Sequence, residues 1–191
     1  MKKKSIAVVL ALVLLVCCAV GGVLAWLTAT SGPVVNTFTV GNVDITLAES
    51  ENLNLKMVPG QTIVKDPKVT VVGGSEACWL FVKVEKSDNL DDFITYAIAT
   101  GDNGWTQGDG TKIPANVYYR AVSAATTGQE FNVLTGNQVT VKDTVTKGMM
   151  DAINKGTATA PTLTFTAYAC QSAGFETNVE GAWVAASAKA A

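Results

Sequence analysis

The most informative pattern of apolar and polar positions occupies residues 35–49, where apolar side chains alternate with polar ones as in a half-buried β-strand. The alternation changes phase midway, because its apolar side chains lie first at even positions and then at odd ones. They are Phe38, Val40, Val43, Ile45 and Leu47. A strand has a period of two, so one extra residue must be absorbed between the two halves. We expect a bulge or tight bend at Gly41-Asn42, because glycine tolerates the backbone angles that it needs.

Similar short alternating runs follow along most of the chain. The further strands predicted from them are 62–64, 69–72, 77–86, 94–99, 116–122, 131–134, 138–142 and 161–171. In the 77–86 run, Cys78 and Leu80 share the apolar face, whereas Trp79 and Lys83 lie on a mixed face that we expect to be a partly covered outer surface.

Turn and helix signals separate these runs. Val58-Pro59-Gly60 and Gly73-Gly74 predict turns. Short helices are predicted within 87–92, 144–155 and 180–191, the last with Trp183 as its only large apolar anchor. Many short strands with little helix predict an all-β fold, an antiparallel β-sandwich that is jelly-roll-like in its connections and has short helical insertions.

The first residues have the pattern of a secretory signal peptide. Three lysines precede an apolar run over residues 6–20, and Gly21-Gly22 and a small residue, Ala25, follow it. We therefore predict cleavage between Ala25 and Trp26. The alternative is a retained membrane anchor, since residues 6–27 are long enough to span a bilayer. The paired glycines and the absence of a basic flank after this run favour the signal peptide.

The net charge of the chain indicates which kinds of partner it can bind. The chain has 14 basic and 16 acidic residues, and removal of the three signal-peptide lysines would leave 11 basic residues and a net charge of −5. Such a balance favours solubility and argues against nucleic acid or an anionic bilayer as a partner.

Cys78 and Cys170 are the two cysteines left after the predicted cleavage. An exported protein could join them in a disulfide. Their positions in the alternating pattern oppose this, because Cys78 lies on the apolar face of its strand and Cys170 lies opposite the apolar residues of its own strand. Both alternatives stay open from the sequence.

The chain contains no histidine. This excludes the H-E-x-x-H zinc motif and every nucleophile that depends on a histidine base. Asp91-Asp92 fits a solvated loop, and Asp109-Gly110 fits a turn better than a calcium site. Trp105 is a weak candidate for stacking on a sugar. We assign no catalytic residue, metal ligand or cofactor.

Four segments resemble those of a known family. They are Gly21–Thr28, Asn36–Gly41, Val58-Pro59-Gly60 with Lys65-Asp66-Pro67, and Ala167–Gln171. In this order they resemble the TasA/camelysin family of Gram-positive bacteria, whose members are exported through a dedicated signal peptidase of the SipW type. The resemblance implies a jelly-roll sandwich and a secreted subunit of biofilm matrix fibres. It also implies polymerisation by donor-strand exchange between copies, with an accessory matrix protein as a further partner that anchors the fibre.

The same resemblance raises an alternative activity, because camelysin-type members have been classed as metallopeptidases. Since this chain has no imidazole ligand, we expect it not to be an enzyme, and a fibre subunit is favoured over a secreted metallopeptidase. A cell-surface adhesin is a third hypothesis. Adhesins usually end in a wall-sorting motif, and the alanine-rich segment up to Ala191 contains none.

The predicted organisation is a signal peptide over 1–25, an N-terminal donor-strand segment over 26–35 and a β-sandwich domain over 36–191. The donor-strand segment carries no charged side chain, and its large apolar residues are those expected to be buried in a neighbouring copy: Trp26, Leu27, Val34 and Val35. Pro33 limits backbone pairing to one side. In the alternative, the segment folds back over its own sandwich.

Overall fold

The computed structural model describes residues 42–50, 56–101 and 104–188, which belong to one compact unit. The predicted signal peptide, the Ala25–Trp26 cleavage site and the donor-strand segment lie outside the described residues, as does Gly41. The odd-numbered half of the opening pattern is described. Val43, Ile45 and Leu47 are half-buried against the core, as predicted.

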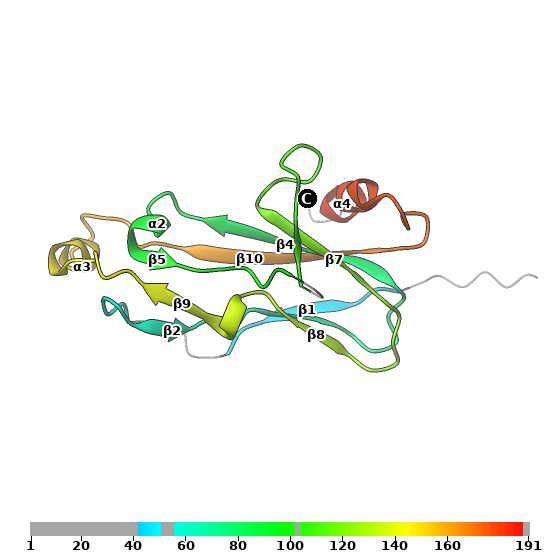
Figure 1. Ribbon diagram of the computed structural model, residues 1–191, viewed down its shortest axis with the longest axis horizontal. Helices are drawn as coiled ribbons and strands as arrows, with labels where there is room; N and C mark the ends of the chain where they lie inside the picture. The colour runs from blue at the N-terminus through cyan, green and yellow to red at the C-terminus, as the bar shows by residue number, and fades with distance from the viewer. Residues whose placement is uncertain (1–41, 51–55, 102–103, 189–191) are drawn as a thin grey trace, which may run out of the picture. The chain divides into compact units, whose positions relative to one another are not determined.

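The described residues form an all-β unit with short helices (Figure 1). Its strands are β1 (Ile45–Ala48), β2 (Thr62–Val64), β3 (Lys68–Val71), β4 (Cys78–Lys86), β5 (Ile94–Thr95), β6 (Thr106–Gln107), β7 (Val117–Val122), β8 (Gln129–Asn132), β9 (Gln138–Val141) and β10 (Leu163–Gln171). Its helices are α2 (Leu90–Phe93), η1 (Thr135–Asn137), α3 (Lys147–Asn154) and α4 (Val179–Ala188). All pairings between these strands are antiparallel, which confirms the predicted fold class. The jelly-roll connection stays a prediction.

One layer is the sheet β10–β4–β7–β6. The other layer contains two small sheets, β1–β3–β8 and β2–β9–β5. Backbone hydrogen bonds join these two sheets, because the Val133 N–H donates to the Pro67 carbonyl at 2.9 Å and the Lys65 N–H donates to the Asn137 carbonyl at 3.0 Å. The β2–β3 segment therefore runs beside the β8–β9 segment as one continuous layer.

The main core lies between the two layers. Its buried side chains come mainly from β3, β4, β9 and the two residues after β8, and they include Val69, Leu80, Val82, Val133 and Leu134. The apolar side chains of β10 that face this core are only partly buried. At one end, α3 covers a smaller cluster around Phe93 and Val141.

The outer face of the β10–β4–β7–β6 sheet is covered by α4 (Figure 1). Trp183 of α4 is 9% exposed, and its ring centroid lies 5.4 Å from those of Phe81 and Tyr168. This confirms that the mixed face of the 77–86 run is a partly covered outer surface, and that Trp183 anchors the last helix.

The turn before β2 has the predicted chemistry. The Gln61 N–H donates to the Val58 carbonyl at 3.0 Å, and Gly60 has a φ of 74°. Proline at the first central position and glycine with positive φ at the second define a type II turn.

The strand register decides between the two alternatives for Cys78 and Cys170. On the paired strands β4 and β10, Cys78 is opposite Gln171, and Cys170 is opposite Trp79. The two thiols therefore lie on opposite faces of one sheet, Cys78 in the main core and Cys170 beneath α4. Both are free, because side chains that point to opposite faces do not meet the geometry of a disulfide.

Candidate functional site

The strand β10 has an open edge. Among the described residues it pairs only with β4, and it ends its sheet. Its nine residues include no charged side chain and no proline. Edge strands are normally protected by charges, proline, bulges or a covering segment, because an unprotected edge offers its amides and carbonyls to another chain. This strand is therefore suited to pairing with a further strand.

A groove runs between this edge and the edge formed by β1 and β2. It contains two neighbouring cavities, of about 440 Å³ and about 310 Å³. Both cavities are lined by Lys65, Leu163 and Thr164. We call this feature the edge groove. The larger cavity adds mainly apolar side chains: Met57, Ile63, Leu90, Ile94 and Val139.

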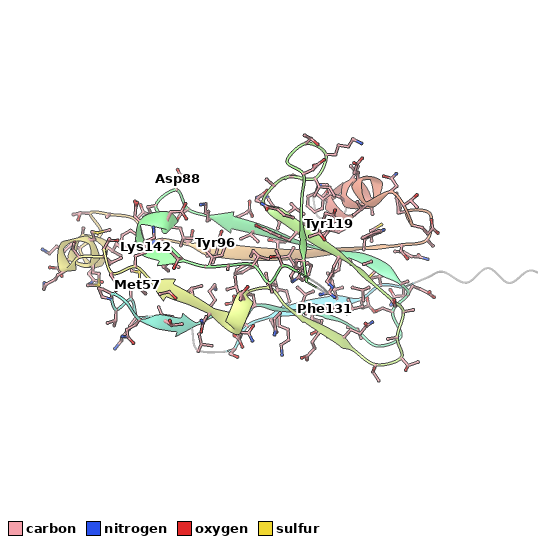
Figure 2. The ribbon with its side chains drawn as sticks, viewed as in Figure 1. Met57, Asp88, Tyr96, Tyr119, Phe131 and Lys142 are labelled. Carbon is pink, nitrogen blue, oxygen red and sulfur yellow. The ribbon has the colours of Figure 1, made fainter. Side chains whose placement is uncertain are left out.

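The larger cavity lies toward the α3 end of the unit. Met57 packs in the same cluster as Met149 and Met150 of α3, and Figure 2 shows Met57 near this end. The smaller cavity lies between Leu47 at the end of β1 and Phe165 of β10. The edge groove therefore follows the first residues of β10.

One ion pair lies in the edge groove. The Lys65 ammonium donates to both carboxylate oxygens of Glu49, at 2.9 and 3.1 Å, and it lies 5.5 Å from the centroid of the Phe165 ring. The Lys65 and Glu49 side chains are only 13% and 26% exposed. Each of these two charges is compensated by the other. A molecule that occupies the groove therefore needs no charged group to neutralise them.

The end of β1 is held in place beside the link between β2 and β3. The Ser50 N–H and hydroxyl both donate to the Asp66 carboxylate, at 2.9 and 2.5 Å. These hydrogen bonds lower the pKa of Asp66, because they stabilise its ionised form. Together with the Lys65–Glu49 pair, they give the wall of the edge groove a fixed shape.

The opposite side of the sandwich, between β7 and β8, is filled. The Arg120 guanidinium of β7 lies 4.0 Å from the centroid of the Phe131 ring of β8 and 5.8 Å from that of Trp105. Burial lowers the pKa of Arg120. These stacked side chains occupy the space between the layers on this side.

Comparisons with protein-family models, with curated proteins and with solved structures found no match to this chain. Of the segments that carry the family resemblance, Lys65-Asp66-Pro67 contributes Lys65 to the lining of the edge groove, and Ala167–Gln171 lies further along β10, outside the lining.

The other candidate residues have structural roles. Trp105 is 2% exposed, and its indole N–H donates to the Asn132 carbonyl at 2.9 Å, so it is a core residue and not a sugar platform. The Asp109 carboxylate accepts from the Thr111 hydroxyl and from the N–H groups of Thr111, Ile113 and Lys112. These bonds hold the pKa of Asp109 well below its usual range and confirm the turn. Asp91 pairs with Lys86 at an exposed position.

The described residues hold no group of three or more histidine, cysteine, aspartate or glutamate side chains placed to bind a metal. Within residues 42–50, 56–101 and 104–188, no helix has the length and apolar character needed to cross a membrane.

Sequence reasoning did not find the edge groove. The sequence feature that could have indicated it is the uncharged run from Leu163 to Gln171, which is unusually long for an exposed strand edge. The sequence does not say which strand lies at an edge, so this run by itself is equally suited to the centre of a sheet.

Proposed function

We propose that this protein is a secreted structural subunit of extracellular biofilm matrix fibres, which assembles by donor-strand exchange. Residues 26–35 of one copy occupy the edge groove of the next. The observation that carries the proposal is the open, uncharged edge of β10 above an apolar groove. The family resemblance supports the location outside the cell, the matrix role and the export through a signal peptidase.

The donor-strand segment is similar to the β10 edge in length and in its lack of charge. It has ten residues and no charge, and β10 has nine residues and no charge. Burial of each large apolar side chain contributes roughly 1.5–3 kcal/mol. Half of that over Trp26, Leu27, Val34 and Val35 would offset much of the cost of ordering a flexible strand, and new backbone hydrogen bonds add to it.

The assembly that follows is a filament. A segment of one copy that binds a groove on another makes a head-to-tail contact, and such contacts extend without closing unless the rotation between copies forms a ring. The main partner is therefore a second copy of this chain. An accessory matrix protein that anchors the fibre is a further expected partner, and no catalytic activity or cofactor is required.

The test compares the chain that begins at Trp26 with one that begins at Asn36, using light scattering and electron microscopy. We expect filaments only from the longer chain, because only that chain contains the donor-strand segment. A synthetic peptide of residues 26–35 should raise the melting temperature of the shorter chain by filling its groove. A peptide of the same composition in scrambled order is the control.

Two outcomes would refute the proposal. In the first, both chains stay monomeric over days at high concentration. In the second, both form the same filaments, which would show that residues 26–35 are dispensable.

A further inference from the structure

The first described residue, Asn42, lies near one end of β10. The Glu76 N–H donates to the Asn42 carbonyl at 3.0 Å, and the Val72 N–H donates to the Asp44 carbonyl at 2.9 Å. Glu76 lies just before β4, whose first residue, Cys78, is opposite Gln171. Asn42 therefore lies near the Gln171 end of β10.

The larger cavity lies at the other end of the same strand, where it is lined by residues 160–164. A nine-residue strand is about 30 Å long at about 3.3 Å per residue. Asn42 and the larger cavity are thus separated by most of the length of β10.

Residues 26–35 could occupy the groove of their own copy or that of a second copy. Because of this separation, the two cases differ in the direction of the segment relative to β10. If residues 26–35 lay in the groove of their own copy, they would run back from Asn42 toward Leu163, so their N-to-C direction would be parallel to β10. A second copy placed head-to-tail brings its own Asn42 end to the Leu163 end of the first. Its segment then enters with residue 35 first and runs antiparallel to β10.

The connection between the segment and the described unit is short. Six residues, 36–41, join the segment to Asn42, and they span at most about 20 Å when extended. The Asn42 end of the donor copy must therefore lie close to the end of β10 at which its segment enters. Entry at the Leu163 end places successive copies end to end, and repetition of this contact extends a filament.

We propose that the donor-strand segment of a second copy enters the edge groove at the Leu163 end and lies antiparallel to β10. Val34 and Val35 then lie nearest the cavity lined by Met57 and Leu163, and Trp26 lies toward Gln171. This inference rests on the proposed function and adds the direction of the donor and the end at which it enters. Pro33, which has no N–H to donate, turns its nitrogen away from β10.

The experiment uses disulfide cross-linking in filaments of the chain that begins at Trp26. Cys170→Ala removes the half-buried thiol, whereas Cys78 is kept because it is fully buried and burial raises its pKa to about 11. Thr164→Cys places a thiol at an exposed position near the entry end. It is combined in turn with a cysteine at position 27, 28, 34 or 35, so that both faces of the donor are sampled.

Disulfides form only when the two Cβ atoms approach to about 3.5–4.5 Å. After mild oxidation, we expect a ladder of covalent multimers on non-reducing gels from position 34 or 35 and none from position 27 or 28. The matched control carries Ala121→Cys, an exposed position on β7, in place of Thr164→Cys, and it should give no ladder from any donor position.

Each other result has a definite meaning. A ladder from position 27 or 28 would overturn the antiparallel direction. Cross-linked monomers without a ladder would show that each copy fills its own groove. Filaments that cross-link at none of the four positions would overturn docking in this groove. If the parent chain forms no filaments before any cysteine is introduced, the proposed function itself fails.

Discussion

Lys65 shows how one side chain can define a surface. It follows β2, yet it binds Glu49 after β1 and lies against Phe165 of β10, so it joins three strands that are distant in sequence. Its ammonium is largely buried, and the Glu49 carboxylate is the group that compensates its positive charge. The stability of the groove wall therefore depends on both members of the pair.

We expect Lys65→Met to lower the free energy of unfolding by about 3 kcal/mol, because it leaves the Glu49 carboxylate without its partner in a largely buried position. The double variant Lys65→Met, Glu49→Leu should recover most of this loss, since no charge remains uncompensated. Urea unfolding measures both.

Lys68→Met is the matched control, because it breaks the exposed pair with Glu130 and should cost less than about 1 kcal/mol. An equal loss from Lys65→Met and Lys68→Met would show that the Lys65–Glu49 pair behaves as an ordinary surface pair.

Among the elements, β10 has the most varied surroundings. One edge pairs along its whole length with β4, one face packs on the main core, and the other face lies under α4. Among the described residues no strand pairs with the remaining edge, although β1 lies near it. Because α4 covers the outer face, a further strand is directed to the edge and not to the face of this sheet.

We expect Trp183→Ala to weaken the packing of α4 on the outer face of the sheet. The indole is 9% exposed and packs against Phe81 and Tyr168, and the loss of a buried aromatic side chain costs about 3–5 kcal/mol. Thermal unfolding measures the loss. The half-buried Cys170 beneath the helix should also react faster with a thiol reagent in this variant.

Val184→Ala on the same helix is the control. Its side chain is 63% exposed, so a change within about 0.5 kcal/mol is expected. A small effect of Trp183→Ala together with unchanged labelling of Cys170 would mean that α4 contributes little to covering the sheet.

At the scale of the whole molecule, the two sides of the sandwich differ. Arg120, Phe131 and Trp105 fill the space between the layers on one side, whereas the other side contains the edge groove. If residues 26–35 bind this groove as proposed, every subunit provides one donor segment and one acceptor groove, and we expect a linear assembly.

The whole molecule should also lack zinc-dependent peptidase activity, because the chain has no histidine to bind a catalytic zinc. The chain that begins at Trp26 is expected to leave casein intact in zymography, with or without a chelator, while a known zinc peptidase on the same gel provides the positive control. Cleavage that a chelator abolishes and added zinc restores would contradict this expectation.

The sequence by itself determined the local features of this protein. Alternation determined which side chains of β4 face the core, and Val58-Pro59-Gly60 determined a turn, because both depend on the sterics of neighbouring residues. The same alternation placed Cys78 and Cys170 on different faces, although only the register between β4 and β10 decided the question of the disulfide.

Only the tertiary structure decided which strand edges stay open and which distant residues meet. Trp105 looks like a loop residue in the sequence and becomes a core residue when the layers close over it. Glu49 and Lys65 meet because β1 and β2 lie on the same side of their layer, and β10 ends its sheet because of the order in which the strands pair. Strand order depends on contacts between segments far apart in the chain, and such contacts leave no periodic pattern in either segment alone.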